Sequence, residues 1–317
     1  MSENFHSPDT VTFAGTLPHD ARRFSHNAMA TVYEIMIMHE DARYAGQAAH
    51  NAFCELDRLE QELSRFIENS DISRINTAGV NRPVTVGLDA FECLERCARL
   101  SRDTNSAFDA TAGPLLQCWS GTGAPSEEVL ARARERTGIR HVHLDRNAVA
   151  VILKTDGMCI DLGGFGKGYA VDRMVNILTE WDIRSALIHG GASSVYALGT
   201  PPGESGWRMS VRNPDDHEHI IAQPCLHNRA ISGSGIRKGR HILDPRTGYP
   251  ASDTSAAWVT GSTAADTDAL STAFMVMREK EIYDFCLNDD DIQALVMAKG
   301  SDGKGKITGF GGFRQVE

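Results

Sequence analysis

The sequence predicts an α+β fold, in which a mixed or antiparallel sheet packs against helices and a helical insertion follows the first strand. Three observations lead to this prediction. An amphipathic helix comes directly after the first apolar strand, short β-rich segments dominate from about residue 140, and Gly and Pro are frequent from 190 to 250, as tight turns require. The chain contains no internal repeat or linker. We therefore expect a loose leader over residues 1–25 and a single domain over residues 26–317.

Composition excludes several classes of protein. The 317 residues are 41% hydrophobic and 23% charged, which is ordinary for a globular protein. Mean hydropathy is -0.29, and no apolar run approaches the roughly 18 residues of a membrane span. Lys and Arg number 32 against 42 Asp and Glu, giving a net charge of -10 without a basic block, which argues against nucleic-acid binding. An anionic ligand would need a metal ion or backbone N–H groups to hold it.

Cysteine usage and the first residues predict a cytoplasmic location. Seven cysteines are scattered along the chain without a CxxC pair, so we expect buried, reduced thiols in place of disulfides or zinc ligands. The first residues, MSENFHSPDTVTFAG, contain no basic segment, apolar core or lipobox of an export signal.

The first half of the chain combines one strand with several helices. From Met29 the run MATVYEIMIM is rich in strand formers. Apolar residues then recur at spacings of four and three from Ala45 to Phe66, which predicts an amphipathic helix with Phe66 on its buried stripe. Further helices are expected over residues 88–103 and 126–136, so the helical part covers about 41–136.

The second half is richer in strands. Strands are expected in HVHLD, AVAVIL, MCIDL, RSALIH, SVYAL, WRMSV and DIQALVMA. One helix carries Val171, Met174, Leu178 and Trp181 on a single face, and two more are expected over 263–277 and 279–287.

A glycine-rich loop is the most informative motif. It reads DLGGFGKGYAVD from Asp161 to Asp172 and lies between an apolar strand and an amphipathic helix. Its four glycines would let the backbone approach a ligand closely, the helix N-terminus favours an anion, and Lys167 adds a cation. It is not a Walker A loop, because Gly168 follows Lys167 where Ser or Thr would hold Mg²⁺, and its spacing is not the Rossmann fingerprint. A tight strand-to-helix turn is the alternative interpretation.

A second motif opens a later helix. Thr263 and Asp266 fit a start resembling a capping box. Asp268 and Thr272 lie four residues apart, so their oxygens share one helix face and suit a hard cation such as Mg²⁺. A capped acidic first turn, matched to the helix dipole, explains the same residues equally well.

Three further segments are weaker candidates. The segment His241-Ile-Leu-Asp-Pro-Arg-Thr-Gly248 predicts a turn with positive φ at Gly248, and His241 could act as a general base or be structural. Asp109-Ala-Thr-Ala-Gly-Pro114 is another polar loop. Phe66, in Ser64-Arg-Phe66, could face a flat ring or belong to the core.

Taken together and in this order, the motifs resemble the ApbE family of Mg²⁺-dependent FAD:protein FMN transferases. The resemblance runs from about Met29 to about Met277. It rests on Met29-Ala-Thr31, Ser64-Arg-Phe66, Ser73-Arg-Ile-Asn76, Asp109–Pro114, Asp161–Asp172, His189-Gly-Gly191, Ser232-Gly233, His241–Gly248 and Thr263–Thr272. It implies an ApbE-like, T-fold-like architecture.

The resemblance also implies roles for individual residues. Mg²⁺ would be held by the Asp268 carboxylate, the Thr272 hydroxyl and the Gly164 carbonyl. FAD, as the substrate, would contact Met29, Phe66, Asp109, Ala110, Thr111, Asp161, Lys167 and His241. A Thr or Ser hydroxyl of an acceptor protein would attack the FMN phosphoryl group and release AMP, with His241 and Asp268 as catalytic residues. No Ser-Gly-Ala-Thr acceptor motif occurs in the chain itself, and the sequence predicts no particular oligomeric state.

The sequence departs from the family pattern at three positions. Ala30 stands where Gly is common, Ala192 where Asp or Asn is frequent, and Arg240 where a second His or an aromatic residue is common. The changes at Ala192 and Arg240 would permit a non-catalytic FAD carrier. An FAD pyrophosphatase, which uses water as the nucleophile, needs the same FAD and Mg²⁺ site and is the other alternative. A nicotinamide oxidoreductase is disfavoured because the dinucleotide fingerprint is missing.

Overall fold

An eight-stranded sheet forms the centre of the protein. The computed structural model describes residues 11–14, 21–121, 123–191, 193–236, 241–300 and 305–316. The strand order is β15-β14-β13-β12-β8-β7-β3-β2, and every neighbouring pair is antiparallel. The strands are β2 (Ala21–Ala28), β3 (Thr31–Met38), β7 (Ala186–Gly190), β8 (Ser194–Leu198), β12 (Arg229–Gly235), β13 (Thr254–Gly261), β14 (Gln293–Ala298) and β15 (Ile307–Phe310).

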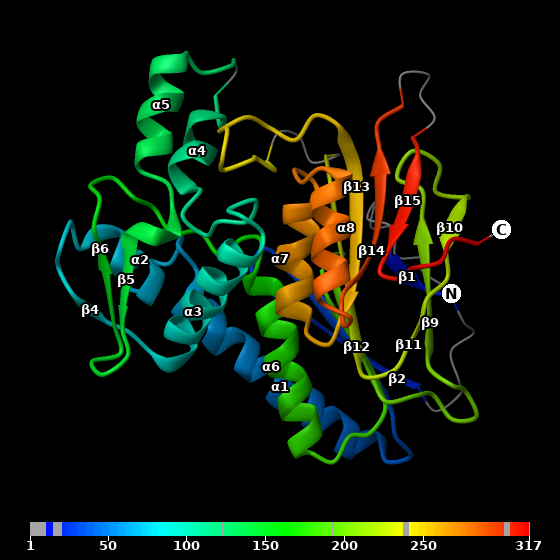
Figure 1. The fold of residues 1–317 in the computed structure, drawn as a ribbon. Helices are drawn as coiled ribbons and strands as arrows, with labels where there is room; N and C mark the ends of the chain where they lie inside the picture. Colours follow the sequence, from blue (N-terminus) through cyan, green and yellow to red (C-terminus); the bar gives the residue numbers. More distant parts are fainter. Residues whose placement is uncertain are drawn as a thin grey trace.

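Helices cover one face of this sheet (Figure 1). They are α1 (Ala42–Leu63), α6 (Gly166–Glu180), α7 (Ala264–Phe274) and α8 (Glu279–Asn288). The strand pattern explains this layer, because Tyr33, Ile35 and Ile37 alternate along β3 and are fully buried against the helices.

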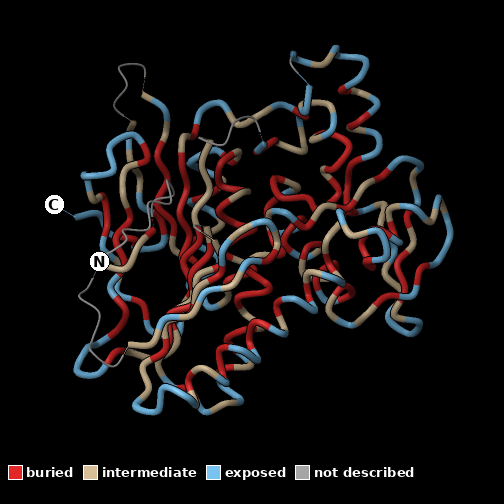
Figure 2. Tube along the Cα trace, turned by 180° about the vertical axis from the view of Figure 1, so that it is seen from behind, coloured by how far each residue is buried: buried red, intermediate tan, exposed pale blue. Residues whose placement is uncertain are grey.

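A small sheet covers the opposite face. It has the order β1-β9-β10, with β11 also pairing with β9. These strands are β1 (Val11–Phe13), β9 (Trp207–Arg212), β10 (Ile220–Ala222) and β11 (Cys225–Leu226). Trp207 and Trp258 fill the core between the two sheets. Buried segments therefore run through three layers, as the tube in Figure 2 shows.

An inserted lobe separates α1 from α6 in the sequence and lies beside the helical layer (Figure 1). It contains α2 (Asp71–Thr77), α3 (Leu88–Asp103), α4 (Gly113–Cys118), α5 (Glu127–Glu135) and the short 3-10 helix Ile139–His141. Its own sheet has the order β4-β6-β5, with β4 (Val84–Thr85), β5 (Val142–Asp145) and β6 (Ala150–Leu153).

The predicted α+β class, with antiparallel sheets and a helical insertion, is confirmed. The helix expected over 88–103 is α3, and most of the other expected helices and strands are present within a few residues. The elements that had not been expected are α2, α4, the 3-10 helix and the strands β1, β2, β4, β10, β11, β12, β13 and β15.

Several expectations were wrong. Residues 11–13 and 21–25, assigned to a loose leader, lie in β1 and β2 because they find partners in β9 and β3. The expected strand MCIDL makes only an isolated bridge between Cys159 and Ala112. Helix α1 ends at Leu63, so Phe66 is not on its buried stripe. All seven cysteines are free thiols as expected, but only Cys93, Cys97 and Cys286 are buried.

Within the described residues, no helix combines the length and the apolar composition needed to cross a bilayer.

His189 makes the stability of the fold depend on pH. It lies on β7 opposite Glu34 of β3, and burial, together with the nearby charge of Arg23, lowers its pKa to about 4. Between about pH 6.5 and pH 4 the unfolded chain binds a proton that the folded chain does not, so the free energy of unfolding falls as the pH falls. At most about 3 kcal/mol would be lost over this interval.

We expect His189→Gln to flatten this pH dependence, as measured by urea unfolding at several pH values between 4 and 7. The exposed His143, replaced by Gln, is the control for losing one imidazole. Equal slopes for wild type and His189→Gln would contradict the prediction.

Candidate functional site

The site is built where the N-terminal turns of α6 and α7 meet. A Cβ atom on Gly168 of α6 would lie 2.1 Å from the Ala264 carbonyl oxygen, so the two backbones are in direct contact and only glycine fits. One turn later, the Asp172 carboxylate accepts hydrogen bonds from the backbone N–H groups of Ala264 at 2.7 Å and Ala265 at 3.0 Å. Asp172 therefore caps α7 from α6 and fixes how the two helices cross.

Arginines of the inserted lobe reinforce this junction. Arg96 of α3 binds Asp266 at 2.9 Å and lies 3.8 Å from Asp172, while Arg99 binds the other oxygen of Asp266 at 2.7 Å. Burial raises the pKa of Asp172 to about 6, although the α7 N–H groups and Arg96 act in the opposite direction. As predicted, the Thr263 hydroxyl caps α7, accepting from the Asp266 N–H at 3.3 Å.

Asp268 presents a buried carboxylate at this junction. The residue is only 2% exposed, and its Oδ2 accepts the Gly168 N–H at 3.2 Å and lies 3.5 Å from Lys167 Nζ. Lys167 also donates to the Gly163 carbonyl at 3.0 Å, so it bridges the glycine loop and α7. Among the described residues, Gly168 and Lys167 both contact Oδ2 of Asp268, which leaves Oδ1 for another ligand.

Gly164 lies against Thr272, which follows Asp268 by one helical turn. A Cβ atom on Gly164 would lie 3.3 Å from Thr272 Oγ1, and Thr272 Oγ1 is 3.3 Å from the Asp268 carbonyl. The described residues contain no cluster of three or more His, Cys, Asp or Glu side chains that could hold a metal. One carboxylate with neutral oxygens fits Mg²⁺, which keeps water and substrate phosphates in its shell. The residues present thus fit the expected ion.

Asp161 links the glycine loop to an exposed aromatic ring. Its Oδ1 accepts the Gly163 N–H at 2.8 Å, and its Oδ2 lies 3.1 Å from Arg65 Nε. The Arg65 guanidinium stacks 4.5 Å from the ring centre of Phe66, which is 83% exposed. This exposure excludes the core interpretation of Phe66 and leaves its ring free to stack on a planar ligand.

The Asp109 loop lies behind Asp161 and braces it. The Asp109 carboxylate accepts hydrogen bonds from the Thr111 N–H and hydroxyl and from the Ile139 N–H, at 2.6–2.9 Å. Asp109, Ala110 and Thr111 are all buried, and the Ala110 carbonyl accepts the Asp161 N–H at 2.7 Å. The Asp109 and Thr111 side chains are thus engaged in holding the loop, and their predicted contact with FAD stays a prediction.

Met29 lies on the hairpin turn that connects β2 to β3. Met29 and Ala30 connect β2 to β3 with φ values of 50° and 57°, as a two-residue type I′ turn requires. Glu60 of α1 accepts the Met29 N–H at 2.7 Å, and the Tyr33 hydroxyl contacts Met29 Sδ at 3.3 Å. Burial raises the pKa of Tyr33, and the negative charges of Asp268 and Glu60 raise it further. Tyr33 therefore contacts the turn, and the charge of Asp268 acts on its hydroxyl.

The His241 segment is anchored next to α7. His241 is exposed, while Ile242 and Leu243 are buried. The predicted turn is confirmed, with φ of 81° at Gly248. Arg246 binds the Asp244 carboxylate at 2.8 and 2.9 Å and donates to the Val276 carbonyl at 2.8 Å, just beyond the end of α7.

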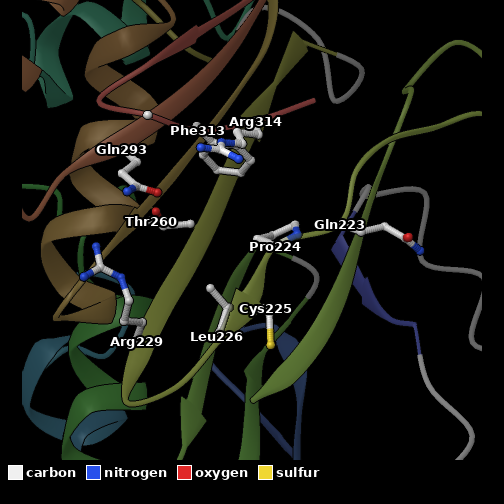
Figure 3. Close-up of a pocket in the computed structure, with 10 residues that line it drawn as sticks. Gln223, Pro224, Cys225, Leu226, Arg229, Thr260, Gln293, Phe313 and Arg314 are labelled. Atoms are coloured by element: carbon white, nitrogen blue, oxygen red, sulfur yellow. The ribbon is translucent and has the colours of Figure 1, made fainter. Parts of the chain in front are cut away.

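A cavity of about 210 Å³ lies elsewhere, at the edge between the two sheets. Figure 3 shows residues from β11, β12, β13, β14 and the C-terminal segment around it, among them Leu226, Thr260 and Phe313. None of the predicted site residues lines this cavity.

Sequence reasoning assigned no role to four residues that support the site, although Arg65 and Asp172 lie within the motifs it singled out. Glu60, Arg65, Asp172 and Ser234 each contact a predicted site residue or the helix that carries it. Ser234 had a usable signal, since it follows Ser232 by two residues and so shares its strand face. The other three depend on long-range contacts that no local pattern contains.

The site and fold can be compared with known proteins. The sequence profile of the ApbE family matches residues 29–296. The chain belongs to the ApbE family. A curated relative from Klebsiella pneumoniae, named FAD:protein FMN transferase, is 26% identical over 301 residues, which cover 89% of this chain and 92% of the relative.

Solved ApbE structures share the fold. The flavinyl transferase ApbE of Pseudomonas stutzeri, in its apo form, aligns with a TM-score of 0.80 at 26% identity, covering 92% of this chain and 94% of that one. The ApbE protein of Thermotoga maritima aligns with a TM-score of 0.81 at 28% identity, covering 92% and 97%. The predicted ApbE-like fold is confirmed. Of the three departures from the family pattern, Ala192 and Arg240 lie outside the described residues.

The contact at Gly168 generates a stability prediction. We expect Gly168→Ala to lower the free energy of unfolding by about 2 kcal/mol or more, because the methyl group would overlap the Ala264 carbonyl. Gly166, two residues earlier in α6, is the matched control, since a Cβ there meets only Leu162 at 3.6 Å. Urea unfolding of both variants checks this, and equal effects would contradict it.

The third departure from the family pattern, Ala30, leads to a prediction of increased stability. We expect Ala30→Gly to raise the free energy of unfolding by about 0.5–1 kcal/mol, because the left-handed backbone at φ 57° is costly for alanine. The control is Ala78→Gly, where φ is -68° and glycine should destabilise. A loss of stability in Ala30→Gly, measured by urea unfolding, would contradict this.

Proposed function

We propose that this protein is a Mg²⁺-dependent FAD:protein FMN transferase. It would transfer FMN from FAD to a Thr or Ser hydroxyl of an acceptor protein and release AMP. The observation that carries the proposal is the α6–α7 junction, where the Asp268 carboxylate and Lys167 lie against the glycine loop and beside Thr272. The names of the curated ApbE relatives support the same activity.

The FAD pyrophosphate would bind over the glycine loop. Asp268 Oδ1, the Thr272 hydroxyl and the Gly164 carbonyl would hold Mg²⁺, which when bound neutralises charge on the phosphates and on the leaving AMP. Lys167 would move from Asp268 Oδ2 to a phosphate oxygen, a short shift for a flexible side chain already 3.5 Å from that carboxylate.

The rest of FAD would extend from this point across neighbouring segments. Phe66 offers an exposed ring for stacking, and Asp161 lies between that ring and the loop. Met29, on its turn beside Tyr33, would contact FAD from the sheet side. The Asp109–Thr111 loop would act through its backbone, because its side chains are already engaged.

His241 is proposed as the general base. Its exposed imidazole would accept the proton of the acceptor hydroxyl as that hydroxyl attacks the FMN phosphorus. Asp244 and Arg246 hold the turn that carries it, through the contact of Arg246 with Val276.

The activity is tested by incubating the protein with FAD and Mg²⁺, with and without an acceptor domain that carries the Thr motif. Acceptor mass, FMN and AMP are followed together. An acceptor that gains one FMN, with equimolar AMP and no reaction after chelation of the metal, is the expected result. FMN and AMP with an unmodified acceptor would favour the pyrophosphatase, and intact FAD in both samples would favour the carrier.

We expect His241→Gly to lower the transfer rate by about 100-fold or more while changing FAD affinity by less than about two-fold. Asp268→Ala should abolish transfer together with its dependence on Mg²⁺. His227→Gly, at another exposed histidine, is the control. Transfer at the normal rate by His241→Gly, measured by acceptor mass, would exclude the proposed base.

A further inference from the structure

A chain of hydroxyl groups lies between β12 and α7, directly behind Thr272. Ser234 of β12 points to the helix face, with its Oγ 2.8 Å from Ser271 Oγ and 3.3 Å from Thr272 Oγ1. Ser271 is fully buried and donates to the Asp268 carbonyl at 2.9 Å. The three hydroxyls therefore connect both ends of the Asp268–Thr272 turn to the sheet.

The available acceptors determine to which atom each of the three hydroxyl groups donates its proton. The Asp268 carbonyl has two lone pairs, one of which accepts the backbone N–H four residues on, as in any α-helix. Ser271 takes the other at 2.9 Å, closer than Thr272 Oγ1 at 3.3 Å. Because the Ser271 proton goes to Asp268, Ser234 can donate to Ser271, and its lone pairs can accept the Thr272 proton in place of the Asp268 carbonyl. Hydrogen bonds aligned in one direction strengthen one another.

We propose that Ser234 is a positioning residue for the metal site. A hydroxyl that binds a metal keeps its proton and must donate it to another group. By accepting the Thr272 proton on the sheet side, Ser234 turns the Thr272 lone pairs toward Gly164, whose Cβ position is 3.3 Å from Thr272 Oγ1. This inference rests on the proposed function, because it presumes that Thr272 binds Mg²⁺.

The same strand contains a matched control. Ser232 lies two residues earlier on the same face, and its Oγ is 2.8 Å from Thr267 Oγ1 of α7. Thr267 donates to the Ala264 carbonyl at 3.1 Å, at the start of the helix. Ser232 and Ser234 thus make comparable contacts with one helix, but only the contact of Ser234 reaches a predicted metal ligand.

The test measures Mn²⁺ binding to the full chain by electron paramagnetic resonance, with displacement by Mg²⁺. Mn²⁺ is a suitable probe because it prefers the same oxygen ligands. We expect Ser234→Ala to weaken Mn²⁺ binding about 10-fold or more, as loss of partners that orient metal ligands does elsewhere. Ser232→Ala should change it by less than about two-fold, and Ser234→Thr, which keeps the hydroxyl, should restore most of the affinity.

The outcomes separate this inference from the proposed function. If wild type binds Mn²⁺ and Asp268→Ala does not, but Ser234→Ala matches Ser232→Ala, the role of Ser234 is overturned and the metal site stands. If wild type does not bind Mn²⁺, the metal site and this inference are both overturned. Urea unfolding of the two alanine variants should give equal stabilities; a loss confined to Ser234→Ala would make its role structural and overturn the inference.

Discussion

The direct contact between the backbones of α6 and α7 is the constraint on which the site depends. Gly168 permits the contact, and Asp172 fixes it by capping α7 from the neighbouring helix. Because Lys167 precedes Gly168 and Asp268 follows the capped turn, the same contact brings the cation and the carboxylate within 3.5 Å. A larger separation of the helices would remove this pair and the hydrogen bond from the Gly168 N–H together. The geometry of the site therefore follows from one close approach.

Because the protein is acidic overall, binding of an anion requires positive charge close to the site itself. With a net charge of -10, the surface as a whole does not attract an anion such as FAD. Under the proposed function, Lys167 and a Mg²⁺ ion held through Asp268 would supply the positive charge at the junction. Among the described residues, Gly168 and Lys167 both contact Oδ2 of the Asp268 carboxylate.

Local patterns in the sequence predicted those parts whose causes are local. The amphipathic spacing of 88–103 produced α3 at the expected bounds, and positive φ at Gly248 followed from the turn chemistry of its segment. Predictions were wrong where tertiary partners decide. Residues 21–25 are polar yet form a strand, because β3 offers a pairing edge. Phe66 continued a helical spacing but lies beyond the last turn, since α1 ends at Leu63. No local pattern indicated that the Ile139 N–H, 30 residues away, would bind the Asp109 carboxylate, and the predicted contact of this loop with FAD stays a prediction.

The hairpin turn at Met29 illustrates how strain and function are connected. Two non-glycine residues adopt positive φ there, although a Gly at the second position would relieve much of the cost. The conformation is held from outside, by Glu60 on the Met29 N–H and by Tyr33 on its sulfur. Both groups belong to elements that pack in the same core as α6 and α7. The turn and the junction are thus fixed by one packed layer. Backbone strain of this kind persists only where the surroundings determine it strongly, and in this protein those surroundings are α1 and β3.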